Sequence, residues 1–268
     1  MTEVPLPITS SAQHLDFRQS LSKSNRHRNE KVFNYLVAHA LSSVRDQTEL
    51  LELFVPGSFP TPERLPIWYE AEPISCRERE GNTKVDLALG AICRRGETAN
   101  GIAFDRTGVG WVCLVEAKLF SDCSTGVQHD QFRNQIARVI ETAATFQTEG
   151  EFPERVAFTL LTPRGFRDSA PARLYSSKYR EYSSEDREAL IEDVKRSSLP
   201  PRNGYQGWVY PTASIESRLK RISLKWAAYE DVFEIAYGWP PFSLLELGSD
   251  RAAAARIDEQ LERVACLG

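Results

Sequence analysis

The alternation of apolar and polar side chains along the chain predicts several β-strands. Residues 84–89 alternate, with Asp86 on the face opposite the apolar side chains, as in a strand that is covered on one face. Residues 111–115 form an almost unbroken apolar run, which is typical of a strand covered on both faces. A further strand is predicted at residues 155–162, and residues 224–233 are expected to form a late strand that passes into a helix.

Other segments have the 3.6-residue period of amphipathic helices. A stripe within residues 33–44 extends back by one turn to Glu30. A second helix is expected after the turn at residues 122–126, and further helices near residues 184–197 and 249–264. The predicted buried stripe of the second helix consists of Phe132, Ile136, Val139, Ile140 and Ala143.

The order of these elements predicts an α/β protein with a central mixed β-sheet flanked by helices, plus helical C-terminal additions. We expect residues 1–20 to form a flexible N-terminal arm, residues 21–165 the core, and residues 166–268 a C-terminal extension packed on that core. The glycine-rich segment 93–110 is expected to be a hairpin or a loop insertion.

Composition is that of an ordinary globular protein, with 41% hydrophobic and 26% charged residues. The sequence has no apolar run of about 18 residues or more, so we expect no membrane span. Five scattered cysteines without a Cys-x-x-Cys pair favour reduced thiols and a cytoplasmic location. Because the four histidines are also dispersed, a zinc or iron–sulfur site is disfavoured.

The first candidate functional residues lie at the end of the apolar run at residues 111–115. Glu116 and Lys118 point the same way on a strand, about 7 Å apart along the chain. Opposite charges that close a buried strand indicate either a structural ion pair or a site for a divalent metal and a phosphate. A second acid-x-Lys sequence, Asp193 to Lys195, lies in a charged helical stretch. Residues two apart do not share a helix face, so that pair is interpreted as solvated surface.

Asp86 supports the interpretation of this region as a site for a divalent metal, because its strand could pair with residues 111–118. A second carboxylate would supply the other half of a site for a hard cation. Mg²⁺ takes oxygen ligands, usually one or two carboxylates, with water and substrate phosphate completing its octahedron. The alternative is an acid on the exposed face of an amphipathic strand.

The combination of Asp86, Glu116 and Lys118 resembles the PD-(D/E)XK phosphodiesterase superfamily, the restriction-endonuclease-like nucleases. The resemblance covers about residues 24–165, and it departs from the family pattern in having Val85 instead of proline before Asp86. It implies that Asp86 and Glu116 bind Mg²⁺, or Mn²⁺ as a substitute, with the carbonyl of Ala117 as a third ligand. Lys118 would orient or deprotonate the attacking water or stabilise the phosphate, and burial would lower its pKa toward base function.

The family pattern also points to residues on the two flanking helices. Glu30 would join the site, binding a second metal or ordering water, although an acid at a helix N-terminus is also favoured by the helix dipole alone. Gln131 and Gln135 would contact the site or the nucleic-acid backbone; the alternative is a solvated helix flank. The Gln-x-x-x-Tyr form of the exonuclease-like branch is absent, which favours an endonuclease.

The expected substrate is nucleic acid, with DNA favoured, in a bacterial or phage defence or restriction context. Arg28, Lys31, Arg94 and Arg95 could contact phosphates, although each also fits an ordinary solvated surface. The net charge of −4 indicates modest affinity and favours a homodimer or a partner protein that adds contacts. Two other hypotheses remain open: a catalytically inactive nucleic-acid-binding or assembly subunit, and an unrelated α/β protein with a structural ion pair.

Overall fold

The computed structural model describes residues 26–43, 48–61, 65–81, 83–96, 100–126, 130–170 and 173–266. The predicted arm at residues 1–20 lies outside these ranges. Within them, the central sheet has five strands in the order β1-β2-β5-β6-β7. These strands are β1 (Ile67–Ala71), β2 (Val85–Gly90), β5 (Trp111–Ala117), β6 (Arg155–Thr162) and β7 (Ser223–Ala228).

The sheet is mixed, as the sequence predicts. Strand β2 pairs antiparallel with both β1 and β5, whereas β5, β6 and β7 run parallel to one another. The chain is thus an α/β protein with a five-stranded mixed sheet flanked by helices and followed by C-terminal helices. No helix in the described ranges combines the length and the apolar character that crossing a bilayer requires.

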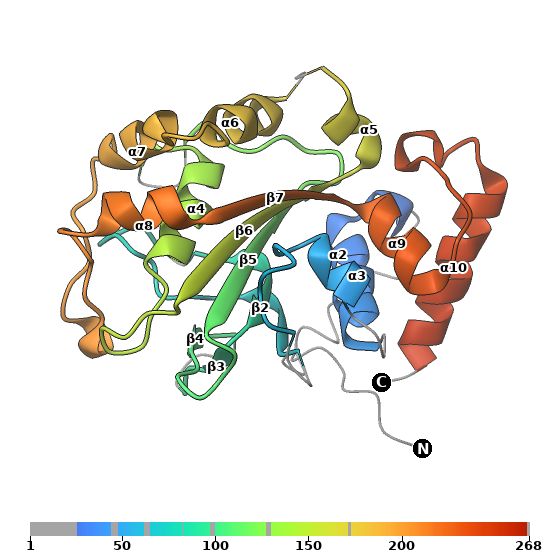
Figure 1. Ribbon diagram of the computed structural model, residues 1–268. Helices are drawn as coiled ribbons and strands as arrows, with labels where there is room; N and C mark the ends of the chain where they lie inside the picture. The colour runs from blue at the N-terminus through green and yellow to red at the C-terminus, as the bar shows by residue number, and fades with distance from the viewer. Residues whose placement is uncertain are drawn as a thin grey trace.

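Helices cover both faces of the sheet (Figure 1). Helices α2 and α9 pack together on one face, and α4 packs on the other against β5 and β6. Around α4 lie α6, α7 and α8. The helical segments are η1 (Arg26–Arg28), α2 (Glu30–Ser43), α3 (Thr48–Glu52), α4 (Gln135–Ala144), α5 (Arg164–Asp168), α6 (Leu174–Tyr182), α7 (Glu188–Lys195), η2 (Tyr205–Gly207), α8 (Ile215–Arg221), α9 (Tyr229–Tyr237), η3 (Leu244–Glu246) and α10 (Arg251–Cys266).

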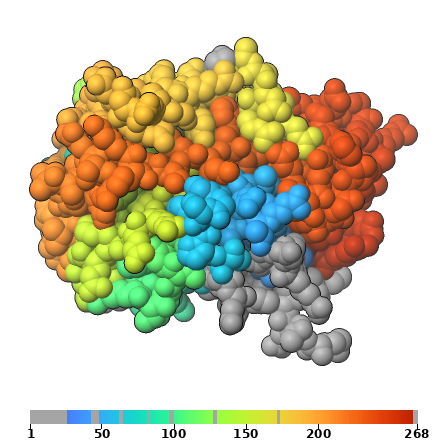
Figure 2. Space-filling model, viewed as in Figure 1, coloured from blue at the N-terminus to red at the C-terminus, as the bar shows by residue number. Residues whose placement is uncertain are grey.

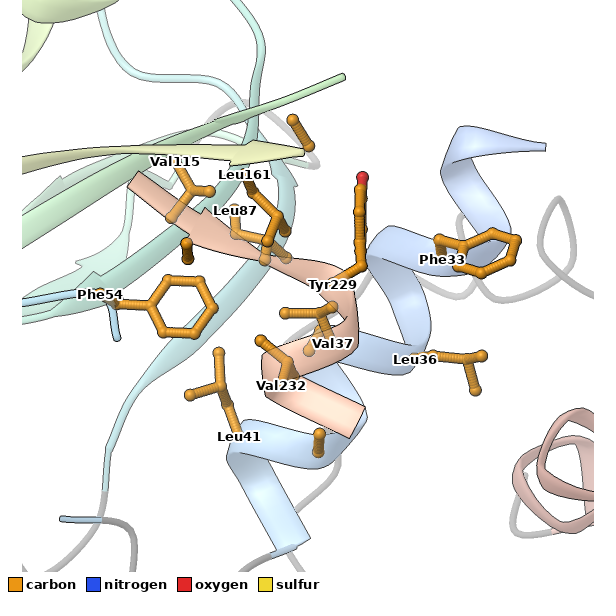
Figure 3. Packing of buried hydrophobic residues seen from close by; sticks show 14 of the residues in the cluster. Phe33, Leu36, Val37, Leu41, Phe54, Leu87, Val115, Leu161, Tyr229 and Val232 are labelled. Carbon is orange, nitrogen blue, oxygen red and sulfur yellow. The ribbon is translucent and has the colours of Figure 1, made fainter. Parts of the chain in front are cut away.

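The apolar run of β5 is buried along its whole length, which confirms that this strand is covered on both faces. Alternate side chains of β5 enter two separate apolar clusters, one beneath α2 and the other beneath α4. In the first cluster, Phe33, Val37 and Leu41 from α2 lie with Val115 and with Tyr229 from the β7–α9 junction (Figure 3). Since each side chain of β5 is buried, any polar group at its end must be held by neighbouring elements.

Two irregular regions follow the sequence predictions. Strands β3 (Ile92–Arg94) and β4 (Ile102–Phe104) form a separate antiparallel pair, so the 93–110 segment contains a hairpin. The predicted late strand is β7, and it continues directly into α9 at Tyr229. Strand β7 forms the edge of the sheet beside β6.

The prediction that Asp193 belongs to the solvated surface is wrong. Its side chain is buried between α6 and α7, where it accepts hydrogen bonds from Tyr182 and Asn134 and pairs with Lys178 at 3.0 Å. Lys195 is exposed, as predicted. Packing of α6 against α7 buries one face of α7, and the charge pattern of α7 alone does not identify that face.

We expect Tyr182→Phe to lower the free energy of unfolding by about 1–3 kcal/mol, because it removes a donor from a buried carboxylate. Burial together with the Asp193 contact raises the pKa of Tyr182, so its hydroxyl is protonated at neutral pH and donates to Asp193. The measurement is urea denaturation followed by circular dichroism. Tyr205→Phe is the control, since Tyr205 is 44% exposed. Equal stability of the two variants would contradict the prediction.

Helix α4 is anchored from its buried side by charged groups. Arg133, which directly precedes the helix cap, forms ion pairs with Glu80 and Glu141, and Arg77 pairs with Glu141 at 2.7 Å. The side chains of Arg133, Glu80 and Glu141 are fully buried. Because a buried charge without a partner is costly, this network favours one position of α4 against the sheet.

Candidate functional site

Asp86 and Glu116 lie at the ends of two adjacent strands. In the β2–β5 register, Leu87 is opposite Val115, so the next pair along is Asp86 and Glu116. Residues directly opposite in an antiparallel pair point to the same side of a sheet, with Cβ atoms about 4.5–5.5 Å apart. The backbone N–H of Ala117 donates to Asp86 Oδ2 at 2.8 Å, which attaches the Asp86 carboxylate to the end of β5. The sheet therefore brings the two acids together.

Glu30 belongs to the same group of acids. It is the first residue of α2, and its Oε2 accepts from the backbone N–H of Leu119 at 2.7 Å and from Ser121 Oγ at 3.3 Å. Extending the apolar stripe of α2 back by one turn thus correctly indicated that Glu30 faces the sheet. Its carboxylate fixes the backbone just beyond Lys118.

Lys118 lies between these carboxylates. Its Nζ is 2.7 Å from Glu116 Oε1, and both side chains are almost completely buried. The backbone N–H of Lys118 donates to Leu161 O on β6 at 2.9 Å, so the parallel ladder continues past the end of β5. This bond fixes the position from which the lysine side chain leaves the sheet.

The two predicted glutamines have different environments. Gln135 begins α4, and its Nε2 donates to Glu116 Oε1. Gln131 is exposed and precedes the helix, because Asn134 caps α4 by accepting from Ala137 N at 3.0 Å. For the same reason the prediction that Phe132 is buried was wrong: it lies outside the helical period and is 57% exposed.

Sequence reasoning missed two residues that position Asp86. Asn34 Nδ2 donates to Asp86 Oδ1 at 3.1 Å, and Tyr229 OH donates to Asn34 Oδ1 at 2.6 Å. Asn34 lies one helical turn after Glu30, so its i+4 spacing was an available signal. Tyr229 comes from the β7–α9 junction, and nothing in the local sequence connects it with Asp86.

The carboxylates are held in an environment that disfavours their charge. Burial raises the pKa of Asp86 well above its usual value, and the charges of Glu116 and Glu30 raise it further. Burial also raises the pKa of Glu116, although Lys118 opposes this shift. A bound cation would relieve both the desolvation and the repulsion.

The expectation of a lowered pKa at Lys118 is not met. Burial does pull this pKa down, but the charges of Glu116, Asp86 and Glu30 together outweigh burial and raise the pKa of Lys118 above its usual value. Lys118 is therefore an ammonium group at neutral pH. That state suits a group that attracts phosphate, and it does not suit a base.

The donor set fits a hard cation. Glu116 accepts two hydrogen bonds, both at Oε1, and Glu30 accepts two, both at Oε2. The other oxygen of each carboxylate accepts no hydrogen bond from the described part of the chain. No cluster of three or more His, Cys, Asp or Glu side chains within the described ranges has metal-binding spacing. Two carboxylates and a carbonyl, here Asp86, Glu116 and Ala117, are nevertheless enough for Mg²⁺, which keeps several waters.

Of the predicted phosphate-binding residues, Arg28 lies two positions before Glu30. It lines a cavity of about 620 Å³ together with Phe120 and Leu244, so the cavity wall includes neighbours of both Glu30 and Lys118. Lys31 instead pairs with Glu70 at 3.2 Å. Arg94 is exposed on β3, and Arg95 donates to the carbonyl of Glu72 at 3.3 Å.

The pH dependence of the free energy of unfolding in EDTA should report the raised pKa of Asp86. A carboxyl group with a raised folded-state pKa stabilises the fold below its unfolded pKa, near 3.8, and loses that contribution as pH rises through the folded-state pKa. We therefore expect Asp86→Asn to gain stability relative to wild type as pH rises from about 4 to 8. Urea melts in EDTA at several pH values measure this difference; a difference that is independent of pH would contradict it.

Comparison of the chain with protein-family models, curated proteins and solved structures finds no match.

Proposed function

We propose that this protein is a Mg²⁺-dependent nuclease with a restriction-endonuclease-like core, cleaving phosphodiester bonds within DNA. The observation that supports it best is the convergence of Asp86, Glu116 and Lys118 at the ends of adjacent strands. Glu30 and Gln135, from the helices on either side of the sheet, join them. The order of β2, β5, α4 and β6 agrees with the arrangement expected for the PD-(D/E)XK superfamily.

Asp86 and Glu116, with the carbonyl of Ala117, would hold the metal ion. When bound, Mg²⁺ lowers the pKa of a water ligand and neutralises the phosphoryl oxygens. The Lys118 ammonium would then face the negative charge that develops on the phosphate during in-line attack. Its contact with Glu116 would weaken as that carboxylate engages the cation.

Other residues would keep these groups in position. Asn34, itself held by Tyr229, fixes one oxygen of Asp86, and Ala117 N–H fixes the other. Gln135 holds one oxygen of Glu116. Glu30 fixes the backbone beyond Lys118 through Leu119, and its second oxygen remains available for solvent or a further cation. Such support restricts the carboxylates to a narrow range of geometries, as catalysis requires.

The test is incubation of the protein with supercoiled plasmid, linear duplex DNA, single-stranded DNA and RNA, each with Mg²⁺, Mn²⁺ or EDTA. We expect metal-dependent cleavage, with nicking of circular DNA because an endonuclease needs no free end. Lys195→Ala is a matched control, since Lys195 belongs to the other acid-x-Lys sequence and is 61% exposed.

The same experiment separates the enzyme from an inactive subunit. If wild type cleaves no substrate with any ion and melts identically with and without metal, the nuclease proposal is wrong. Retained DNA binding in that case would favour the nucleic-acid-binding subunit.

A further inference from the structure

A second cavity, of about 360 Å³, lies at the opposite end of the sheet from the candidate active site. Its wall is formed by the start of β6, the end of α8 and the segment around Phe59. Figure 2 shows these three segments meeting on one face of the molecule, in lime, orange and cyan. Arg155, at the start of β6, is five residues from Leu160, the partner of Glu116 in the parallel ladder, which corresponds to about 16 Å. The two sites are therefore separate.

Three arginines, Arg155, Arg218 and Arg221, line this cavity with one acid, Glu154. Neither Arg218 nor Arg221 forms an ion pair with any described residue, and Glu154 pairs with none of the three arginines. The cavity therefore has an excess of positive charge in a protein whose net charge is −4. Uncompensated guanidinium groups around a concave surface favour an anionic ligand.

The guanidinium groups are held in place by contacts other than ion pairs. Arg218 lies over the ring of Phe152, 3.7 Å from its centroid, and its Nε is buried without a hydrogen-bond partner. Arg155 donates to the carbonyl of Ser58 and lies 5.8 Å from the centroid of Phe59. Arg221 Nε donates to Ser217 O at 3.2 Å. Stacked, hydrogen-bonded arginines lose little side-chain entropy when they bind an anion.

The electrostatics of the cavity favour an anionic ligand. Burial lowers the pKa of Arg218, and the neighbouring charge of Arg221 lowers it further. Both effects raise the free energy of the charged cavity when no counter-charge is present. An anion between Arg218 and Arg221 would remove the repulsion and supply a partner for the buried Nε.

We propose that this cavity binds a phosphate monoester carried by a nucleotide. The forked guanidinium groups match the oxygens of a terminal phosphate. The apolar side chains of Phe59, Pro153 and Ile222 line the same cavity and suit a flat organic ring. Its volume also falls within the range of about 300–1,000 Å³ that small-molecule sites occupy. The proposal does not depend on the nuclease function.

The test is isothermal titration calorimetry of the full chain in EDTA, which keeps the acidic site free of metal. Adenosine 5′-monophosphate, adenosine and inorganic phosphate are the probes. We expect the nucleotide to bind more tightly than either fragment, and Arg221→Ala to weaken its binding by about tenfold or more. Arg221 is exposed, so its replacement should not affect folding.

Two further variants test whether binding depends on the charges of the cavity wall. Lys220→Ala removes the same charge from the same helix but not from the cavity wall, and it should bind like wild type. Glu154→Gln removes the only acid among the described residues of the wall, and this variant should bind the nucleotide more tightly. Equal affinity for nucleotide and nucleoside, or equal weakening by Arg221→Ala and Lys220→Ala, would overturn the proposal.

The phosphate monoester could belong to a free nucleotide or to the end of a nucleic-acid strand. Short oligonucleotides with a 5′-phosphate or a 5′-hydroxyl distinguish these sources. Preference for the phosphorylated oligonucleotide, lost in Arg221→Ala, would identify the strand end as the ligand. Binding of the mononucleotide alone would identify a small-molecule site.

Discussion

Lys118→Ala should reduce the rate of the proposed metal-dependent DNA cleavage by about 10²–10⁴-fold, because it removes a buried positive charge that the proposed mechanism places beside the reacting phosphate. The fold should persist, because the apolar side chains of β5 are untouched, but with a lower free energy of unfolding, because the buried Glu116 loses its ion-pair partner. The measurement is single-turnover plasmid nicking at saturating Mg²⁺.

Metal binding by the Lys118→Ala variant should remain or become tighter. Lys118 Nζ lies 2.7 Å from Glu116 Oε1, so removal of the lysine side chain frees that carboxylate oxygen. The increase in melting temperature produced by Mg²⁺ should therefore be at least as large as in wild type. A variant that loses both cleavage and metal stabilisation would contradict the assignment of Lys118 to phosphate.

Asp86→Asn should abolish both cleavage and metal stabilisation, with a rate loss at least as large as that of Lys118→Ala. It removes the charge of the proposed metal ligand but keeps the shape of the side chain. The amide oxygen of the new asparagine can accept from Ala117 N. Its amide nitrogen would face Asn34, so the Asn34 amide would turn to accept from it with Oδ1 and to donate to the Tyr229 hydroxyl with Nδ2.

For wild type, Mg²⁺ at one hundred times its Kd should stabilise the fold by about 2.7 kcal/mol. The Asp86→Asn variant should show little of this stabilisation, yet be more stable than wild type in EDTA at neutral pH, because the raised pKa of Asp86 opposes its charge in the fold. Asp168→Asn, an exposed acid on α5, is the control. If the EDTA and Mg²⁺ melts of wild type coincide, Asp86 is not a metal ligand.

Much of the fold could be predicted from the sequence, because burial imposes a local pattern. The apolar run of β5 requires cover on both faces, and the period of α2 predicts the side that contacts the sheet. The positions of Asp86, Glu116 and Glu30 follow from the same patterns. Each lies at the end of an element whose buried face was already evident.

What the sequence left undetermined depends on contacts between distant segments. The start of α4 at Gln135 is set by the Asn134 cap and by the ion pairs of Arg133 with Glu80 and Glu141, and this excludes Gln131 from the helix. Burial of Asp193 depends on packing between α6 and α7.

The raised pKa of Lys118 likewise follows only from tertiary structure. Sequence alone predicts burial, which lowers the pKa of a lysine. The fold places three carboxylates, from α2, β2 and β5, around one ammonium group, and their combined attraction exceeds the cost of desolvation. Local patterns determine which side chains are buried, but the charge state of a buried group depends on what the rest of the chain places beside it.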